Sequence, residues 1–67
     1  MQTEIKEFRI DDMVSVSEPT QKFEEHTHAF SGKVVAVCIF LHAYVIEDSE
    51  ENEYTVDYRN MELEGDL

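Results

Sequence analysis

The sequence has few basic residues and few of the residues that interrupt or cross-link a chain. Its 67 residues include five Lys and Arg, two Gly, one Pro, one Cys and no Trp. A lone cysteine cannot form an internal disulfide, which argues against the cross-linked domains typical of small secreted proteins. So little Gly and Pro excludes a linker or a collagen-like repeat. We therefore expect a folded domain in a reducing, cytoplasmic compartment.

Acidic residues outnumber basic ones by 16 to 5, a formal net charge of −11. Such a chain repels nucleic-acid phosphates and anionic lipid, so we expect no direct nucleic-acid binding and no membrane binding. The N-terminus shows no signal-peptide pattern, and the longest apolar stretch (residues 34–46) is too short to span a bilayer. The charge favours a protein partner with a basic or apolar surface. The length predicts a single domain, 1–67, without the deep walled cavity of an enzyme.

The first half of the chain predicts one strand and a long loop. Residues 13–16 alternate apolar and polar side chains, as a half-buried strand does. The single proline then breaks the strand and begins a polar connection, residues 18–30. We expect Phe23 and Phe30 of this connection to pack back onto the core. Ser31 and Gly32 (residues 31–32) are typical of a turn.

The apolar stretch that follows is rich in β-branched residues. Six of the thirteen residues in 34–46 are Val or Ile, which favours a strand. One straight strand of this length would run about 43 Å, longer than the roughly 28 Å globule expected for this chain. It must therefore turn near residues 41–43, which gives strands near 33–41 and 44–48. Both faces of the first strand are apolar, and one barrel interior cannot cover both.

A hairpin and a short closing strand complete the prediction. Residues 44–48 and 53–58 form the two arms of the hairpin. Residues 59–61 indicate one helical turn, and residues 62–63 a last short strand. Five short strands predict a small all-β barrel, over about residues 8–64, followed by a short polar tail.

This order of elements resembles the SH3-like small β-barrels, a group that includes KOW and Tudor-like domains. The resemblance is carried by DDMVSV, a long first loop, FSGKVVAV, YVIED turning back into EYTVDY, and RNMEL. It implies a five-stranded SH3-like barrel with one short helical turn before the last strand, and a binding module rather than an enzyme. It does not identify the ligand, because one fold serves many functions. The basic residues of the nucleic-acid-binding members are mostly missing.

The candidate partner-binding site combines an apolar strand with an acidic hairpin tip. Residues 47–53 hold five acids in seven residues. They lack the glycine that a calcium-binding EF-hand loop needs at its sharp turn, so we interpret them as a contact for a basic partner. The residues predicted to bind the partner are Phe40, Glu47, Asp48, Glu50, Glu51, Glu53, Tyr54 and Tyr58.

The residues able to bind a metal or act as a nucleophile do not form a recognisable motif. Zinc usually takes four ligands in paired short spacings, and only His26 and His28 form a short pair. Cys38 lies in an apolar strand without a nearby cation to lower its pKa. We expect two solvated loop histidines, a buried inert thiol, no metal, no cofactor and no catalytic residue.

The sequence therefore predicts a small acidic, non-enzymatic protein-binding module. It would suit a regulator or inhibitor that docks on a larger protein, of the kind that viruses and mobile elements encode. The excess apolar face would be covered by residues 1–10, by the loop 18–30, by the partner, or by a second copy in a homodimer through the apolar strand 34–41.

Two other functions remain open. The expected globule of roughly 28 Å lies alongside about 16 phosphate charges of duplex DNA, so this chain could be a DNA mimic that inhibits a nucleic-acid-binding protein. Alternatively, Tyr44, Tyr54 and Tyr58, with Asp57 or Glu47, would form a Tudor-like aromatic cage that reads a cationic ligand.

Overall fold

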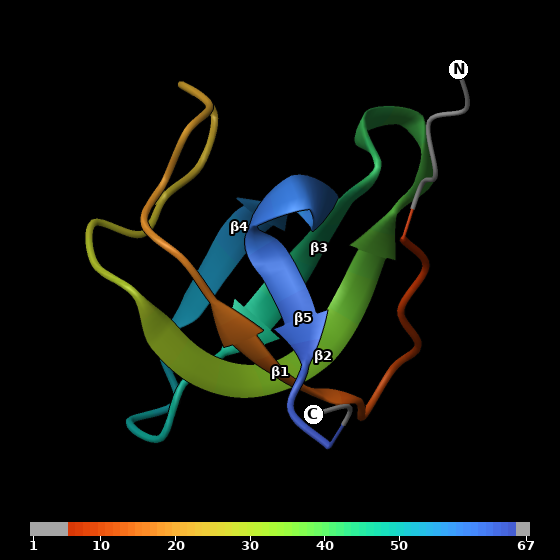
Figure 1. Cartoon of the computed structure of the whole chain (residues 1–67), viewed down its shortest axis with the longest axis vertical. Helices are drawn as coiled ribbons and strands as arrows, with labels where there is room; N and C mark the ends of the chain where they lie inside the picture. Colours follow the sequence, from red (N-terminus) through yellow and green to blue (C-terminus); the bar gives the residue numbers. More distant parts are fainter. Residues whose placement is uncertain (1–5, 66–67) are drawn as a thin grey trace.

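The computed structural model describes residues 6–65, which form five strands in one antiparallel sheet (Figure 1). In chain order the elements are β1 (Met13–Val16), β2 (Phe30–Cys38), the 3₁₀ turn η1 (Ile39–Leu41), β3 (Ala43–Glu47), β4 (Glu53–Asp57), the 3₁₀ turn η2 (Tyr58–Asn60) and β5 (Met61–Leu63). The strand order in the sheet is β4-β3-β2-β1-β5. The predicted all-β domain of five strands, with a helical turn before the last one, is confirmed. Residues 1–5 and 66–67 of the predicted domain lie outside the described residues.

The long strand β2 curls the sheet into a barrel-like shape (Figure 1). It pairs with β1 through residues 30–33 and with β3 through residues 33–38. A β-bulge between Val34 and Ala36 shifts the register against β3, and such bulges bend and twist a strand. The predicted strand over residues 33–41 is therefore wrong at both ends, because β2 begins earlier and ends at Cys38.

Gly32 lies inside β2 rather than in the turn that the sequence predicted. A Cβ atom built on Gly32 would lie 2.4 Å from the backbone oxygen of Glu47 and 2.7 Å from Cγ2 of Ile46. No other residue fits this approach of β2 to β3 without a shift of the backbone. Glycine inside a strand often marks such a close approach.

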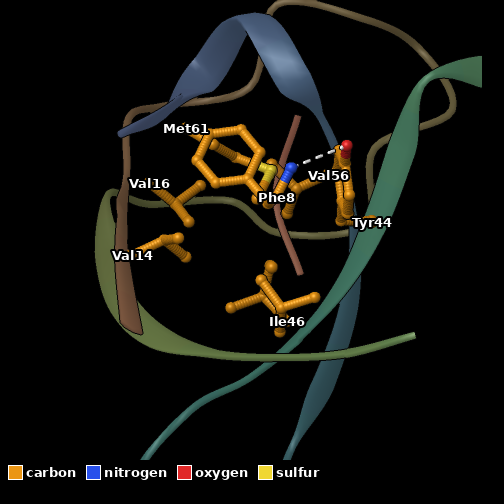
Figure 2. Packing of buried hydrophobic residues seen from close by; sticks show 8 residues of the cluster. Phe8, Val14, Val16, Tyr44, Ile46, Val56 and Met61 are labelled. Carbon is orange, nitrogen blue, oxygen red and sulfur yellow. Dashed lines mark hydrogen bonds between the residues drawn. The ribbon is translucent and has the colours of Figure 1, made fainter. Parts of the chain in front are cut away.

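The hydrophobic core fills the inside of the curled sheet. The buried apolar side chains are Phe8, Val14, Val16, Val34, Ala43, Tyr44, Ile46, Val56 and Met61. Figure 2 shows the cluster that these residues form without Ala43. Phe8, which precedes the first strand, enters the core edge-on to Tyr44, with ring centroids 5.2 Å apart. Its backbone N–H donates a hydrogen bond of 3.0 Å to the Tyr44 hydroxyl, which satisfies this buried polar group.

Truncation of the core should cost a large part of the stability. Val56 is completely buried on β4, so we expect Val56→Ala to lower the free energy of unfolding by about 1–3 kcal/mol, through lost transfer energy and a partial cavity. Val37→Ala is the control, because Val37 is 45% exposed, and its effect should stay below about 0.5 kcal/mol. Urea denaturation of both variants measures the difference. Equal effects would show that the two positions are equally buried in solution.

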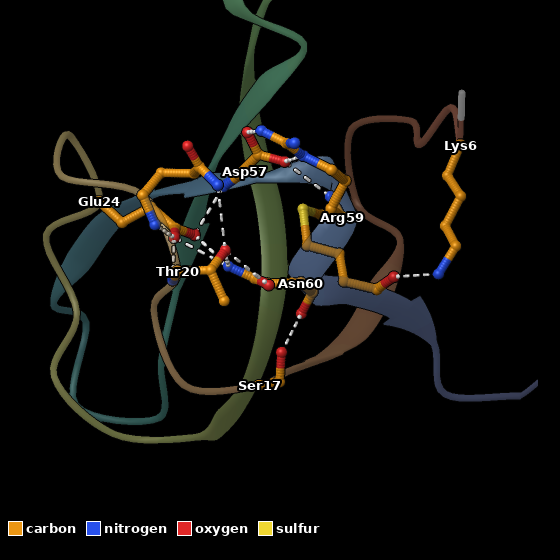
Figure 3. A network of polar contacts seen from close by, with 9 residues as sticks. Lys6, Ser17, Thr20, Glu24, Asp57, Arg59 and Asn60 are labelled. Atoms are coloured by element: carbon orange, nitrogen blue, oxygen red, sulfur yellow. Dashed lines mark hydrogen bonds and ion pairs between the residues drawn. The ribbon is translucent and has the colours of Figure 1, made fainter. Parts of the chain in front are cut away.

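The loop between β1 and β2 is tied to the far side of the sheet by the carboxylate of Glu24 (Figure 3). This carboxylate accepts hydrogen bonds from the backbone N–H of Thr20, Gln21 and Asp57 at 2.8, 2.9 and 2.9 Å. It also accepts from the side-chain amide of Asn60 at 2.8 Å. Burial of Glu24 raises the pKa of the carboxyl, but the four hydrogen bonds together outweigh burial and leave this pKa below its ordinary value.

The same loop covers the outer edge of β4. The backbone N–H of Glu25 donates to the carbonyl of Thr55 at 3.2 Å, and the N–H of Thr55 donates to Oε1 of Glu25 at 3.0 Å. The next outward N–H, that of Asp57, donates to Oε2 of Glu24. Two loop residues thus occupy the place of a neighbouring strand.

The aromatic residues of this loop and of the start of β2 divide between core and surface. Phe30 is half-buried and packs against the core, as predicted. Phe23 is 39% exposed, so the prediction that it packs on the core is wrong. The prediction that His26 is solvated is also wrong, since the residue is 3% exposed. Its ring lies 5.6 Å from Phe30, edge-on, and Nε2 lies 2.8 Å from the carbonyl oxygen of Ser17, which can only accept.

Candidate partner-binding site

Four apolar side chains are exposed where β2 passes into β3. Val37 is 45%, Ile39 76%, Phe40 95% and Leu41 52% exposed. We call these four residues the apolar turn. His42 closes it in the left-handed conformation, with φ of 52°, and its N–H donates to the carbonyl of Ile39. The chain thereby leaves the sheet for a single 3₁₀ turn, which places consecutive apolar residues in solvent.

A shallow cleft of about 370 Å³ lies beside the apolar turn. Its walls include Phe8 and Tyr44 from the core, and Val37 and Ile39 from the turn. The charged side chains that line it, Glu7 and Arg9, have opposite signs, so the surroundings of the apolar turn are not strongly acidic.

The acidic residues of the predicted site gather at the tip of the β3–β4 hairpin. We call Glu47, Asp48, Glu50, Glu51 and Glu53 the acidic hairpin. Glu47 of β3 lies directly opposite Glu53 of β4. Like charges in this arrangement repel each other, although Lys33 of β2 lies directly opposite Glu47 on its other side and offsets part of this repulsion.

Asp48 holds the tip of the hairpin in one conformation. Its Oδ1 accepts hydrogen bonds from the backbone N–H of Glu50 and of Asn52, both at 2.9 Å. The bond from Asn52 contributes most to a pKa of the Asp48 carboxyl below its ordinary value. The Asp48 carboxylate is therefore ionised at neutral pH. Glu51, between these donors, adopts a φ of 67°.

The apolar turn and the acidic hairpin lie at opposite ends of β3. In Figure 1 they are the green turn at the upper right and the blue-green loop at the lower left. Five residues of strand separate them, a span of about 16 Å. The structure therefore does not bring Phe40 together with the acids of the predicted site. The apolar turn and the acidic hairpin form two separate surfaces.

The three tyrosines do not face one another. Tyr44 is buried in the core, and Tyr58 lies in η2, edge-on to His42 at 5.9 Å. Tyr54 packs edge-on against Phe30 at 5.2 Å. The buried carboxylate of Asp57 is not available to a cage, because its two oxygens accept hydrogen bonds from Nε and Nη2 of Arg59. These side-chain bonds from Arg59 are the main cause of an Asp57 pKa below its ordinary value.

The residues considered for metal binding or nucleophilic chemistry are also separate. Cys38 is half-buried rather than buried, and His28 is exposed. Within residues 6–65, no three His, Cys, Asp or Glu side chains lie close enough together to hold a metal ion. In the same residues, no helix is long and apolar enough to cross a membrane.

Two features of the surface escaped sequence reasoning. The sequence does not predict the exposure of Ile39 and Leu41, because residues 39–41 are apolar and are typical of a continued strand. The row of aromatic rings from His26 through Phe30 to Tyr54 joins a loop to a strand distant in sequence. Its only local sign is the spacing of His26 and Phe30.

Comparison with known protein families, curated proteins and solved structures finds no significant match.

Proposed function

We propose that this chain is a small acidic, non-enzymatic module that docks on a larger protein through the apolar turn. The observation that carries the proposal is the 95% exposure of Phe40, next to three other exposed apolar residues. Burial of one such side chain at an interface contributes about 1.5–3 kcal/mol. Contiguous exposed apolar residues on a small domain are typical of a protein interface.

The acidic hairpin has a different role in this proposal. At about 16 Å from the apolar turn, it acts on a partner mainly through its long-range field. Such charges raise the association rate with a basic partner and change the dissociation rate less. Two copies of the chain, each with a net charge of −11, repel each other, which favours a different protein over a homodimer as the partner.

The proposal extends to the biological setting. We infer a regulator or inhibitor that acts in the cytoplasm, of the kind encoded by a virus or mobile element. The strand order and the 3₁₀ turn before β5 support a place among the SH3-like barrels, many of which bind proteins.

Replacement of Phe40 tests the apolar turn. The wild-type chain is used to capture and identify a partner, and binding rates are then measured with the purified partner. Because Phe40 makes little contact with its own domain, Phe40→Ser should leave the thermal unfolding temperature unchanged and raise the dissociation rate at least about tenfold. Phe23→Ser, at another exposed phenylalanine, is the control and should bind as wild type. Unchanged dissociation of the Phe40 variant would contradict the proposal.

Salt dependence tests the acidic hairpin. The Debye length falls from about 30 Å at 0.01 M salt to about 8 Å at physiological ionic strength, so association of the wild type should slow markedly over this range. Replacement of Glu50, Glu51 and Glu53 by Gln should flatten that dependence without a loss of stability, since the three side chains are exposed. Identical salt slopes for the two proteins would remove the hairpin from the association step.

Mimicry of DNA is the second candidate function. The direct opposition of Glu47 and Glu53 favours it, because a mimic of DNA needs neighbouring carboxylates in place of neighbouring phosphates. A DNA mimic would compete with duplex DNA for its partner. Displacement of the chain by duplex DNA, together with wild-type affinity of the Phe40→Ser variant, would establish mimicry in place of docking through the apolar turn.

A further inference from the structure

A second cleft, distinct from the apolar turn, lies between the end of the long loop and the acidic hairpin. It has a volume of about 260 Å³ and is lined by the segment from His26 to Phe30, by Asp48 and by Tyr54. The loop and the first residue of β2 contribute one wall, and the β3–β4 hairpin contributes the other.

Aromatic rings form much of the lining of this cleft. The ring of Phe30 lies edge-on between His26 at 5.6 Å and Tyr54 at 5.2 Å. Phe30 and Tyr54 are only half-buried, so part of each ring remains open to a ligand. The negative face of such rings attracts a cation.

The charge that lines the cleft is negative and comes from Asp48. Asp48 is ionised at neutral pH, and its Oδ1 accepts the two backbone hydrogen bonds of the hairpin tip. The side chains of Asn52 and Tyr54 also help to lower the pKa of this carboxyl. No Lys or Arg is among the described residues that line the cleft. The neighbouring acids of the hairpin strengthen the negative potential.

The buried ring of His26 also lines this cleft. Its Nε2 donates to the carbonyl of Ser17, because a carbonyl oxygen can only accept. Within the described part of the chain, Nδ1 is buried and has no hydrogen-bond partner.

From these observations we propose that this cleft binds an arginine side chain of a protein partner. A guanidinium group is planar, stacks on aromatic rings and donates parallel hydrogen bonds to a carboxylate. The cleft offers both surfaces within one volume, the rings of Phe30 and Tyr54 and the carboxylate of Asp48. A lysine ammonium lacks the flat face, and a neutral side chain lacks the charge. This inference rests on the proposed function only in taking the partner to be a protein.

The test uses N-acetyl-arginine amide as the probe, titrated into the ¹⁵N-labelled full chain and followed by NMR. We expect saturable shifts at Phe30, Asp48 and Tyr54, with a dissociation constant on the order of 10 mM. The citrulline analogue has nearly the same shape without the charge and should give no saturable shifts. The lysine analogue should bind at least about threefold more weakly, since it cannot stack.

Matched variants locate the site. Asp48→Asn keeps an oxygen that can accept the hairpin bonds and should weaken the probe at least about fivefold. Glu62→Gln removes one exposed carboxylate from β5, outside the cleft, and should change the affinity less than about twofold. Unfolding temperatures of both variants exclude a loss of fold as the cause.

Three results would overturn the inference: binding of the citrulline analogue as tight as that of arginine, shifts spread over all exposed carboxylates, or equal affinities of the two variants. Phe40→Ser separates this inference from the proposed function. This variant should bind the probe as wild type does, whether or not Phe40 is needed for the partner.

Discussion

Gly32→Ala is expected to remove a large part of the stability of the chain. The added Cβ would meet the backbone oxygen of Glu47 at 2.4 Å and Cγ2 of Ile46 at 2.7 Å, and a backbone atom cannot rotate away. Overpacking of this kind costs about 1–3 kcal/mol and sometimes more. A domain of this length has a stability of about 3–10 kcal/mol.

Urea denaturation followed by circular dichroism measures this loss. Gly65→Ala is the matched control, since a Cβ at Gly65 would have no neighbour within 4 Å, and its midpoint should equal that of the wild type. If the two glycine variants unfold at the same urea concentration, β2 does not approach β3 as closely as described.

The second large effect is expected at Glu24. Glu24→Ala removes the acceptor of four donors, two of which belong to the buried residues Asp57 and Asn60. Two buried donors without a partner would cost about 2–6 kcal/mol, but the Asn60 amide keeps its 3.1 Å bond to Thr20, so we expect a loss of about 2–4 kcal/mol in all. Glu25→Ala is the control, because exposed Glu25 accepts a single side-chain bond, from Thr55, and its loss should be less than about 1 kcal/mol.

Acid should destabilise the protein through the same carboxylate. The pKa of Glu24 is lower in the folded state than in the unfolded chain, so its contribution is complete above the unfolded value. The contribution is lost as the pH falls from there through the lowered folded value. Asp57, whose pKa is also lowered, acts in the same direction. Thermal unfolding measured from neutral to acidic pH should therefore show a steeper decline for the wild type than for Glu24→Gln. Parallel curves would contradict this role of Glu24.

Most strands were predictable because their signals are local. The alternation at Met13–Val16 depends only on neighbouring residues, and the structure has β1 in the same place. The hairpin was predicted nearly to its bounds for the same reason. The turn near residues 41–43 followed from chain length and globule size rather than from any turn residue. The structure turns at η1 and at His42, a residue other than glycine that adopts a positive φ.

The errors arise where distant segments meet. Gly32 was assigned to a turn. In the structure it must be glycine because the backbone of β3 passes too close to leave room for a Cβ atom. The local sequence does not reveal this contact. Tyr58 continues the alternation of β4 in the sequence but lies in η2, where Asp57 accepts a bond from the N–H of Arg59. His26 was expected in solvent, although a carbonyl in the preceding part of the loop holds it in the interior.

The candidate site was predictable in its parts but not in its arrangement. The acidic hairpin and Phe40 are both at the surface, as sequence reasoning required. Their separation by the length of β3 depends on where β2 ends, and the apolar run hides that end. The cleft beside Asp48 depends on the path of the long loop, which a polar sequence does not specify.

The cover that Glu24 and Glu25 place over β4 also protects against aggregation. An open strand edge is a template on which a second chain can add a strand, and sequential addition leads to fibrils. Here the two outward N–H groups of β4 that the loop reaches are bonded to carboxylates, and the bond to Glu24 loses the help of the negative charge once that carboxyl is protonated. Acid would therefore weaken the cover of this edge and, at the same time, remove negative charge that keeps copies apart. The acidic composition thus keeps the sheet of each molecule from continuing into the next.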